Sequence, residues 1–244
     1  MIPLKDDTAR ERIPLLNYLI IAINVAVFSQ ELVLGDSVDE FVSRFGLVPS
    51  TMTVGIADGF SPEVHLLPWL THMFIHGGWL HLLGNLWFLH IFGDNVEDRL
   101  GRFRFLVLFF SGGLIAGLAQ IITSPGDSTP MVGASGAISA IVGAYLVLYP
   151  RARILTLLPI FVLFYFVRIP AFIFIGLWFG LQLLYGYTSL LSQSTGGGVA
   201  WWAHVGGFAA GLVLAFLLKA GTVARPRVEL ARGRMNVLRR RSDG

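Results

Sequence analysis

Apolar segments long enough to cross a lipid bilayer limit the fold of this chain more than any other feature. The hydrocarbon core of a bilayer is about 30 Å thick, so a helix needs about 20 apolar residues to cross it. Six segments of roughly this length follow one another: 14–34, 69–92, 105–123, 131–149, 171–191 and 199–218. Because an α-helix pairs its own backbone groups inside lipid, we predict an all-α membrane protein, a bundle of six transmembrane helices.

The composition agrees with this prediction. Only 14% of the residues are charged and 55% are apolar, whereas about a quarter of the residues in soluble domains are charged. The chain has no cysteine, which excludes a disulfide framework, a thiolate metal site and a thiol nucleophile. We therefore expect the lipid bilayer as a partner, and no nucleic acid.

The placement of Lys and Arg predicts the orientation of the chain. Residues 1–13, the turn around 99–104, the region 151–168 and the tail 220–244 are basic, while the intervening loops are acidic or uncharged. Basic loops stay on the cytoplasmic side of a membrane. We expect both termini in the cytoplasm, a multi-pass protein of the bacterial inner membrane, and one domain at 14–219 between the N-terminal segment 1–13 and the tail 220–244.

Two connecting segments are too apolar to be ordinary loops. The first loop, 35–68, carries acidic residues beside apolar clusters, and we expect it to lie at the membrane interface. Residues 154–167 are apolar but are interrupted by Pro159 and followed by Arg168 and Pro170. We interpret this second segment as a re-entrant or interfacial piece, because proline disrupts a helix.

Polar side chains within the apolar segments are functional candidates, because they are costly inside a membrane. His81 and Asn85 are four residues apart, so they share one helix face. Counting to the next basic residue, Ser135, His204 and Asn85 lie 16, 15 and 14 residues away. At about 1.5 Å per residue, each lies roughly 21–24 Å from the cytoplasmic edge. Three helices thus place a hydroxyl, an imidazole and an amide in one layer.

This layer contains the groups that nucleophilic acyl chemistry requires. A serine hydroxyl is a weak nucleophile until a base removes its proton, and His204 can be that base for Ser135. Asn85, His81 and the backbone amide of Ser135 can donate hydrogen bonds to an oxyanion. The segments that carry these residues contain no Asp or Glu. The arrangement predicted is therefore a Ser–His dyad.

The same residues also fit non-catalytic roles, which stay open at this point. Small residues such as Gly136, Ala140, Gly207 and Gly211 indicate close helix packing, in which Ser135 could be one more small residue. His72 and His76 have an i, i+4 spacing that could bind a metal, but the His-Glu-x-x-His pattern of metalloproteases is absent. A transporter or channel is disfavoured, because the segments of the polar layer carry no charged side chain for ion coupling.

At these residues the chain resembles the rhomboid family of intramembrane serine proteases. The shared motifs are Leu47-Val48-Pro49, the run from Phe74 to Asn85 with its His-x-x-x-Asn, the run from Ile91 to Asp98, Gly133-Ala134-Ser135-Gly136, and Ala203-His204-Val205-Gly206-Gly207. A Gly-x-Ser-Gly alone is a weak signal. Together with the His-x-x-x-Asn run before it and the Ala-His-x-x-Gly run after it, it becomes a specific one.

The resemblance implies an enzyme, a serine endopeptidase that hydrolyses peptide bonds in or near transmembrane segments of membrane-protein substrates, with no cofactor or metal. It implies Ser135 as nucleophile, His204 as general base, His81 and Asn85 as oxyanion donors, and a structural role for His76. Two positions differ from the family pattern. Leu70 replaces the arginine of a Trp-Arg pair, and Ser139 replaces a tyrosine that stacks on the histidine in some members. The alternative is an inactive rhomboid-like protein, which the presence of both Ser135 and His204 disfavours.

Overall fold

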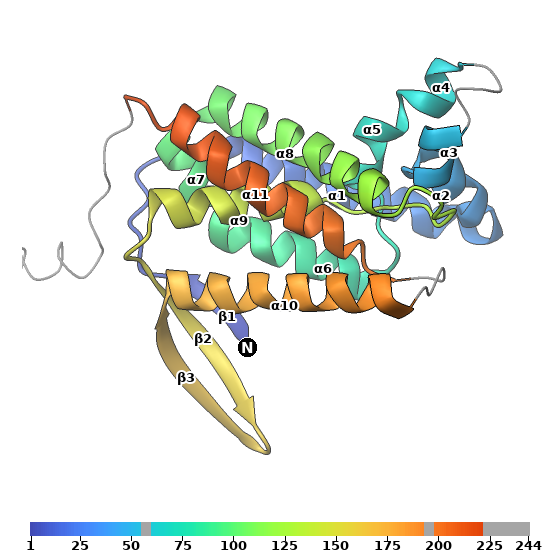
Figure 1. Ribbon diagram of the computed structural model, residues 1–244. Coiled ribbons are helices and arrows are strands. Elements are labelled where there is room, and N and C mark those ends of the chain that lie inside the picture. The colour runs from blue at the N-terminus through green and yellow to red at the C-terminus, as the bar shows by residue number, and fades with distance from the viewer. Residues whose placement is uncertain (55–59, 193–197, 222–244) are drawn as a thin grey trace, which may run out of the picture.

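The computed structural model describes residues 1–54, 60–192 and 198–221, and this part of the chain is mostly helical (Figure 1). The long helices are α1 (Leu15–Leu34), α8 (Arg102–Thr123), α9 (Ser135–Leu148), α10 (Ala171–Ser192) and α11 (Trp201–Leu218). A further helical run consists of α6 (Trp79–Phe88), the π-helix η3 (Leu89–Gly93) and α7 (Asp94–Leu100). Short helices connect α1 to α6: η1 (Gly35–Ser37), α2 (Val38–Phe45), α3 (Pro49–Val54), α4 (Pro62–His65), α5 (Pro68–Thr71) and η2 (His72–Phe74). The strands β1 (Ile2–Asp6), β2 (Arg153–Ile160) and β3 (Leu163–Pro170) form a small sheet.

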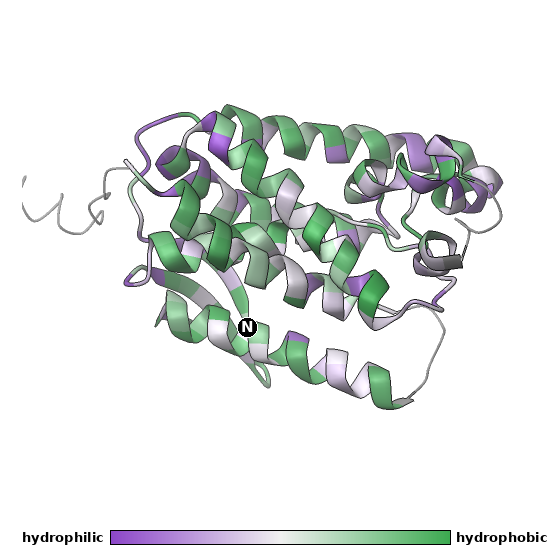
Figure 2. Ribbon diagram, turned by 45° about the horizontal axis from the view of Figure 1, so that its top comes forward, coloured by the Kyte–Doolittle hydropathy of each residue, from purple (hydrophilic) through white to green (hydrophobic). Residues whose placement is uncertain are grey.

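The long helices lie side by side, with mainly hydrophobic residues along their length (Figure 2). Within the described residues, four helices are long and apolar enough to cross a membrane: α1 continued to Phe45, α8, α10 and α11. The predicted number of six is not established by this criterion. The reason is that α6 has only 10 residues before the π-helix and α9 has only 14.

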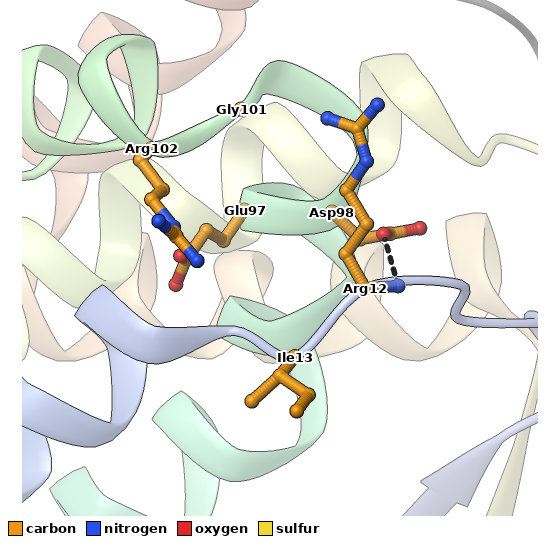
Figure 3. A pocket seen from close by; sticks show the side chains of 6 residues that line it. All are labelled: Arg12, Ile13, Glu97, Asp98, Gly101 and Arg102. Carbon is orange, nitrogen blue, oxygen red and sulfur yellow. Dashed lines mark hydrogen bonds between the residues drawn. The ribbon is translucent and has the colours of Figure 1, made fainter.

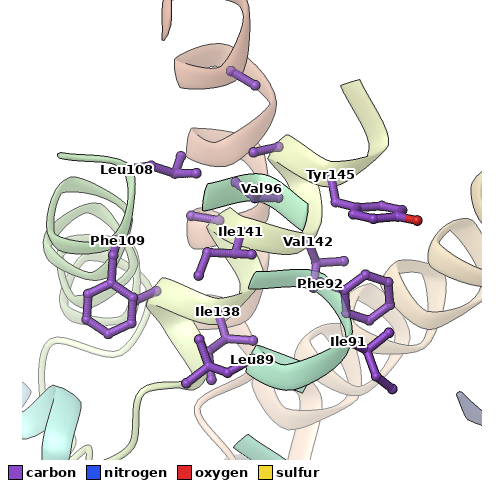
Figure 4. Packing of buried hydrophobic residues seen from close by; sticks show 14 of the residues in the cluster. Leu89, Ile91, Phe92, Val96, Leu108, Phe109, Ile138, Ile141, Val142 and Tyr145 are labelled. Carbon is purple, nitrogen blue, oxygen red and sulfur yellow. The ribbon is translucent and has the colours of Figure 1, made fainter. Parts of the chain in front are cut away.

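Helix α9 forms the centre of the bundle. Its residues from Gly136 to Tyr145 are all buried, because α8, α11 and the η3 region surround it. Figure 4 shows Ile138, Ile141 and Val142 of α9 packed among side chains of α8 and of the η3–α7 region. A helix that is apolar all round is typical of such a buried position.

Small residues bring α9 and α11 into close contact. A Cβ atom at Gly211 would overlap the carbonyl oxygen of Ala140, and one at Gly207 would overlap that of Gly136. Glycine therefore lets the two backbones approach each other, as in other small-residue helix contacts in membranes. The close contact places the start of α11 beside the start of α9, where Ser135 lies.

The second apolar segment is not one helix from residue 69 to 92, so that boundary was predicted wrongly. Helix α6 begins only at Trp79, after the Gly77-Gly78 pair, and Gly78 has a φ of 143° that favours glycine. Further along, the π-helix η3 changes the hydrogen-bond pattern. The Asn17 side-chain amide of α1 donates to the carbonyl of Leu89 there at 3.0 Å. The fourth apolar segment begins at residue 131, and its helix α9 begins at Ser135.

Residues 153–170 form a β-hairpin, which the all-α prediction missed. Strands β2 and β3 pair antiparallel from Arg153↔Pro170 to Ile160↔Leu163, and β1 pairs with the other edge of β2. Proline is tolerated because Pro170 ends β3 and Pro159 lies one residue from the end of β2. The hairpin leaves the bundle between α9 and α10 and slants away from α10 (Figure 1).

The two ends of the bundle differ in character. At one end, the short helices α2 to α5 gather (Figure 1). At the other end, the N-terminal segment meets the hairpin and α7: Arg10 forms an ion pair with Asp94 at 3.1 Å, and Asp7 accepts the Arg153 amide at 2.8 Å. Arg104 at the start of α8 donates to the Ala220 carbonyl after α11 at 3.0 Å. Residues 193–197 and the basic tail from residue 222 onward lie outside the described residues.

Candidate active site

Ser135 and His204 meet between α9 and α11. The Ser135 Oγ atom lies 2.8 Å from Nε2 of His204, so the hydroxyl donates to the imidazole when the ring proton is on Nδ1. His204 is buried, with 8% of its surface exposed, whereas Ser135 is half-buried. The structure thus brings together the two residues that the sequence analysis expected to act as nucleophile and base.

The backbone before Ser135 is not helical: a bridge at Met131 is followed by a turn, and the serine occupies the first position of α9. Met131 pairs with Leu47 of the first loop, and the Gly133 amide donates to the His72 carbonyl at 2.8 Å. Gly133 has a φ of 113°, a conformation that favours glycine. Since the first amides of a helix have no partner within it, the Ser135 amide points out of the start of α9 as a hydrogen-bond donor.

His81 and Asn85 both lie beside Gly133, two residues before the serine. A Cβ atom at Gly133 would lie 2.5 Å from Nε2 of His81 and 3.5 Å from Nδ2 of Asn85. His81 accepts the Gly77 amide through Nδ1 at 3.4 Å, which leaves the ring proton on Nε2, the atom that faces Gly133. The buried Nδ2 of Asn85 has no hydrogen-bond partner among the described residues. Two side-chain donors therefore converge next to the Ser135 backbone.

A cavity of about 730 Å³ opens onto this group of residues. Its walls include His81 and Asn85 of α6, Ser135 of α9, Gln182 of α10 and His204 of α11. The remaining lining is mostly apolar, which is typical of a binding pocket with a few converging polar groups.

Gln182 is a site residue that the sequence analysis missed. Its Oε1 atom lies 2.8 Å from Nδ1 of His204, on the side of the ring opposite Ser135. Trp178 and Trp201 flank the same ring, with centroids 6.4 and 6.1 Å from it. An amide within the apolar segment 171–191 was the signal that could have identified it. The Ser139 hydroxyl donates to the Ser135 carbonyl at 2.7 Å and not to the imidazole.

The other histidines of this region have local partners. His72 contacts the Pro68 carbonyl through Nδ1 at 2.7 Å. The His76 amide donates to Glu31 at 3.1 Å. The i, i+4 spacing of His72 and His76 is not helical here, because η2 ends at Phe74. Glu31 is a buried carboxylate at membrane level that the sequence analysis did not consider, and it holds the loop before α6 rather than the serine.

A second cavity, of about 370 Å³, lies at the opposite end of the bundle and is lined by Arg12, Ile13, Glu97, Asp98, Gly101 and Arg102 (Figure 3). The Asp98 carboxylate accepts the Arg12 amide at 2.9 Å, and Glu97 accepts the Asn17 amide at 2.7 Å. Glu97 therefore caps the start of α1, where the helix dipole favours negative charge, and Asp98 holds the segment just before that helix. The acidic residues of α7 therefore have a structural role.

At the same end of the bundle, a buried polar cluster joins β1 to α9 and α7. The Tyr145 hydroxyl donates to the Asp6 carboxylate, and Asn95 donates to the same carboxylate at 3.0 Å. Burial raises the pKa of Asp6, even though the hydrogen bond from Tyr145 opposes this shift. Burial, together with the nearby charge of Asp6, raises the pKa of Asp94 to about 7.

Known proteins resemble this chain over its membrane core. The sequence model of the rhomboid domain family matches residues 63–221 of this chain. "Putative rhomboid protease YdcA" of Bacillus subtilis is 38% identical over 77 residues, which are 32% of this chain and 38% of that protein. "RHOMBOID-like protein 5" of Arabidopsis thaliana is 31% identical over 146 residues, 60% of this chain and 42% of the relative. "Presenilin-associated rhomboid-like protein A, mitochondrial" of Danio rerio is 33% identical over 101 residues, 40% of this chain and 26% of the relative.

These matches cover less than half the length of each relative. They come from bacterial, plant and mitochondrial proteins, so they do not indicate one membrane or one compartment. The domain match covers more than half of this chain and includes every residue of the site. Together with the apolar helices, it identifies the chain as an integral membrane protein that belongs to the rhomboid family.

Proposed function

We propose that this chain is an intramembrane serine endopeptidase that hydrolyses peptide bonds in or near transmembrane segments of membrane proteins. The observation that carries the proposal is the 2.8 Å contact between Ser135 Oγ and His204 Nε2 at the wall of the large cavity. Membership of the rhomboid family supports a protease. The polar groups that converge around Gly133 support acyl transfer in particular.

In the first half of the reaction, the Ser135 oxygen attacks the carbonyl carbon of the substrate peptide while Nε2 of His204 takes the hydroxyl proton. The negative charge that develops on the carbonyl oxygen is stabilised by Asn85, His81 and the Ser135 amide. The imidazolium then gives its proton to the leaving amine as the C–N bond breaks. Ser135 is left as an ester with the new carboxyl end of the substrate.

In the second half, water attacks the ester carbonyl while His204 takes one of its protons. The same three donors stabilise the second tetrahedral intermediate. His204 returns the proton to the Ser135 oxygen as the ester bond breaks, which regenerates the hydroxyl and releases the acid. The charged intermediate of each half is held by groups already in place, so no resident cofactor is needed.

We further propose that the domain 14–219 crosses the membrane six times, with the segment 1–13 and the tail 220–244 in the cytoplasm of a bacterial cell. The proposal counts α6 with η3 as one crossing and α9 as another. It is supported by the contact of Arg104 with Ala220, because the start of α8 and the end of α11 must then lie on one side. The short helices α2 to α5 would form an interfacial loop on the other side.

The substrate enters this site as an extended segment, because a helix hides its carbonyl groups in its own hydrogen bonds. Gly costs about 1 kcal/mol and Pro about 3 kcal/mol in a helix relative to Ala. We therefore expect cleavage near the outer end of a substrate helix, after a small residue and before helix-weakening residues.

The test is cleavage of a model single-span substrate by the purified full-length chain in liposomes, with mass spectrometry of the products. A cut near the outer boundary, absent with Ser135→Ala, is the expected result. The alternative is an inactive rhomboid-like protein that binds membrane proteins without cutting them. Binding of the substrate without any product would favour that alternative, and a cut at the cytoplasmic end would contradict the proposed site of attack.

A further inference from the structure

The imidazole of His204 is held on both sides. Nε2 faces Ser135 and Nδ1 faces the side-chain oxygen of Gln182, each at 2.8 Å. A neutral imidazole carries its proton on one nitrogen only, and the partner of the other nitrogen selects which one. An amide oxygen can only accept, so Gln182 selects the ring with its proton on Nδ1. In that tautomer the lone pair of Nε2 faces the serine hydroxyl.

The position of Gln182 is unusual for a polar side chain. It is 7% exposed, whereas its neighbours Leu181 and Leu184 on α10 are 44% and 54% exposed. An amide on an otherwise apolar membrane helix is costly unless a partner satisfies it. Its partner here is the imidazole at the start of α11. Among the described residues, Gln182 is the only hydrogen-bond partner of the His204 Nδ1 atom.

We infer that Gln182 is a positioning residue, which fixes the tautomer and the orientation of the His204 ring for proton transfer from Ser135. The inference rests on the proposed function. The role is the one that a buried carboxylate has in a Ser–His–Asp triad, carried out by a neutral acceptor. A neutral group suits a site within the membrane, where burial of an additional charge is costly.

The test compares Gln182→Leu and Gln182→Glu in the full-length protein in liposomes, measuring kcat and KM against pH. Gln182→Leu keeps the volume but removes the acceptor. We expect kcat to fall roughly 10- to 100-fold with little change in KM, the range lost when the outer partner of a metal-ligating histidine is removed. Gln182→Glu keeps the acceptor. We expect it to retain activity and to move the acidic limb of the kcat profile to higher pH, because a carboxylate favours the imidazolium.

Gln120→Leu is the matched control. Gln120 is 8% exposed on α8 and accepts the Ala203 amide at 3.3 Å, so it is a buried amide that contacts α11 without touching the imidazole. We expect this control to change stability without moving the pH profile. A wild-type kcat and pH profile in Gln182→Leu would overturn the inference, as would an unmoved acidic limb in Gln182→Glu. A wild-type protein that cleaves no substrate would instead defeat the proposed function.

A second, independent observation concerns the β2–β3 hairpin. Its turn consists of Phe161 and Val162, which are 99% and 86% exposed, and Phe164 and Phe166 of β3 are each 65% exposed. Phe161 has a φ of 53°, a conformation for which tight turns normally use Asn or Gly. Apolar side chains thus occupy positions where a hairpin in water carries polar residues.

The base of the hairpin has the opposite character. Arg151, Arg153 and Arg168 are all exposed there, at the end of the bundle where α10 begins. Helix α10, which follows the hairpin directly, also exposes apolar side chains: Phe172 and Leu177 are 57% and 52% exposed. A membrane leaflet matches this pattern, since anionic headgroups attract basic residues and the lipid tails cover apolar ones.

We propose that the hairpin is a lipid anchor, with its tip among the lipid tails of the leaflet whose headgroups face the arginine base. The chain has no cysteine, so a single nitroxide label can be placed at Phe161→Cys. Leu177→Cys is the control facing lipid, and Ser128→Cys, in an exposed loop, is the control facing water. The measurement is the collision rate of each label with oxygen and with a water-soluble nickel complex, in liposomes that contain anionic lipid.

We expect the label at residue 161 to collide with oxygen and to be shielded from nickel, as at residue 177. Collision with nickel, as at residue 128, would place the tip in water and overturn the proposal. Shielding from both reagents would place it against protein, such as a second copy of the chain, and would overturn the proposal equally.

Discussion

Two hydroxyl groups, ten residues apart on α9, are used in different ways. Ser135 contacts the imidazole of His204 at the wall of a large cavity. Tyr145 contacts the carboxylate of Asp6, and its side chain is fully buried among Phe92 and Tyr149. Each hydroxyl thus has a group that can accept its proton. The two hydroxyls differ in whether a substrate can reach them. They also differ in whether hydrogen-bond donors lie nearby to stabilise a reaction intermediate.

Around Ser135, the donors of His81 and Asn85 and the start of α9 lie at the wall of a cavity that a substrate can occupy. Around Tyr145, the hydrogen bonds link β1, α7 and α9 to one another. The comparison indicates that a polar group within this bundle is a candidate for catalysis when unpaired hydrogen-bond donors and a cavity lie beside it. A polar group whose hydrogen bonds are all made to neighbouring elements, with no cavity beside it, instead holds those elements together.

The largest effect is expected for Ser135→Ala. Removing the hydroxyl deletes the nucleophile, so cleavage of a model membrane substrate should be lost. The fold should persist, because the position is followed by Gly136 and Ala137 and tolerates a small side chain. Product formation by the purified variant at the wild-type rate would show that Ser135 is not the nucleophile.

The next largest effect is expected for Asn85→Ala. Loss of one oxyanion donor typically costs about 2.7–4 kcal/mol, or roughly 100- to 1000-fold in kcat, while His81 and the Ser135 amide remain. The turnover rate is measured beside that of His81→Ala. If both variants turn over as fast as wild type, the unpaired donors near Gly133 have no part in the reaction.

Tyr145→Phe tests the other end of α9 and should lower stability rather than activity. The variant removes one of the donors to the Asp6 carboxylate, and a hydrogen bond to a charged group contributes about 1.5–3 kcal/mol. Unfolding in mixed micelles gives the stability, and turnover per folded molecule gives the activity. A loss of turnover without a loss of stability would assign the Tyr145 cluster to catalysis.

A further expected effect concerns how the free energy of unfolding depends on pH. The pKa of Asp94 is raised to about 7 in the folded protein from 3.8, mainly by burial. The folded state therefore binds more protons than the unfolded state between these pH values, and its stability falls as pH rises through about 7. Asp94→Asn removes this group and should flatten the slope of unfolding free energy between about pH 4 and pH 7. A slope equal to that of wild type would mean that Asp94 is ionised throughout.

The sequence predicted the polar layer well because helix geometry converts residue spacing into depth. Ser135 and His204 could be placed at one level before any contact was known. The sequence could not predict the pairing that holds the segment before Ser135, because its partners Leu47 and His72 are distant in the chain. It also did not reveal the hairpin, since apolar residues on both faces of β3 hide the alternation that marks a strand.

Gln182 was missed for a different reason. A carboxylate is the usual third member of a triad, and the apolar segments of the polar layer contain none, but an amide can satisfy the same nitrogen. Glu31 shows the converse, because it is a buried carboxylate that binds the His76 backbone and not the catalytic candidates. The type of residue alone does not decide such roles, which depend on the contacts between helices.

The most direct measurement is covalent labelling of the purified protein with a fluorophosphonate, followed by mass spectrometry of the modified peptide. We expect one label on Ser135. It should be absent in Ser135→Ala, form much more slowly in His204→Ala, and be unaffected in Tyr145→Phe once corrected for the amount of folded protein. No label on the folded wild-type protein, or a label at another residue that persists in Ser135→Ala, would contradict the assignment of Ser135 as a nucleophile activated by His204.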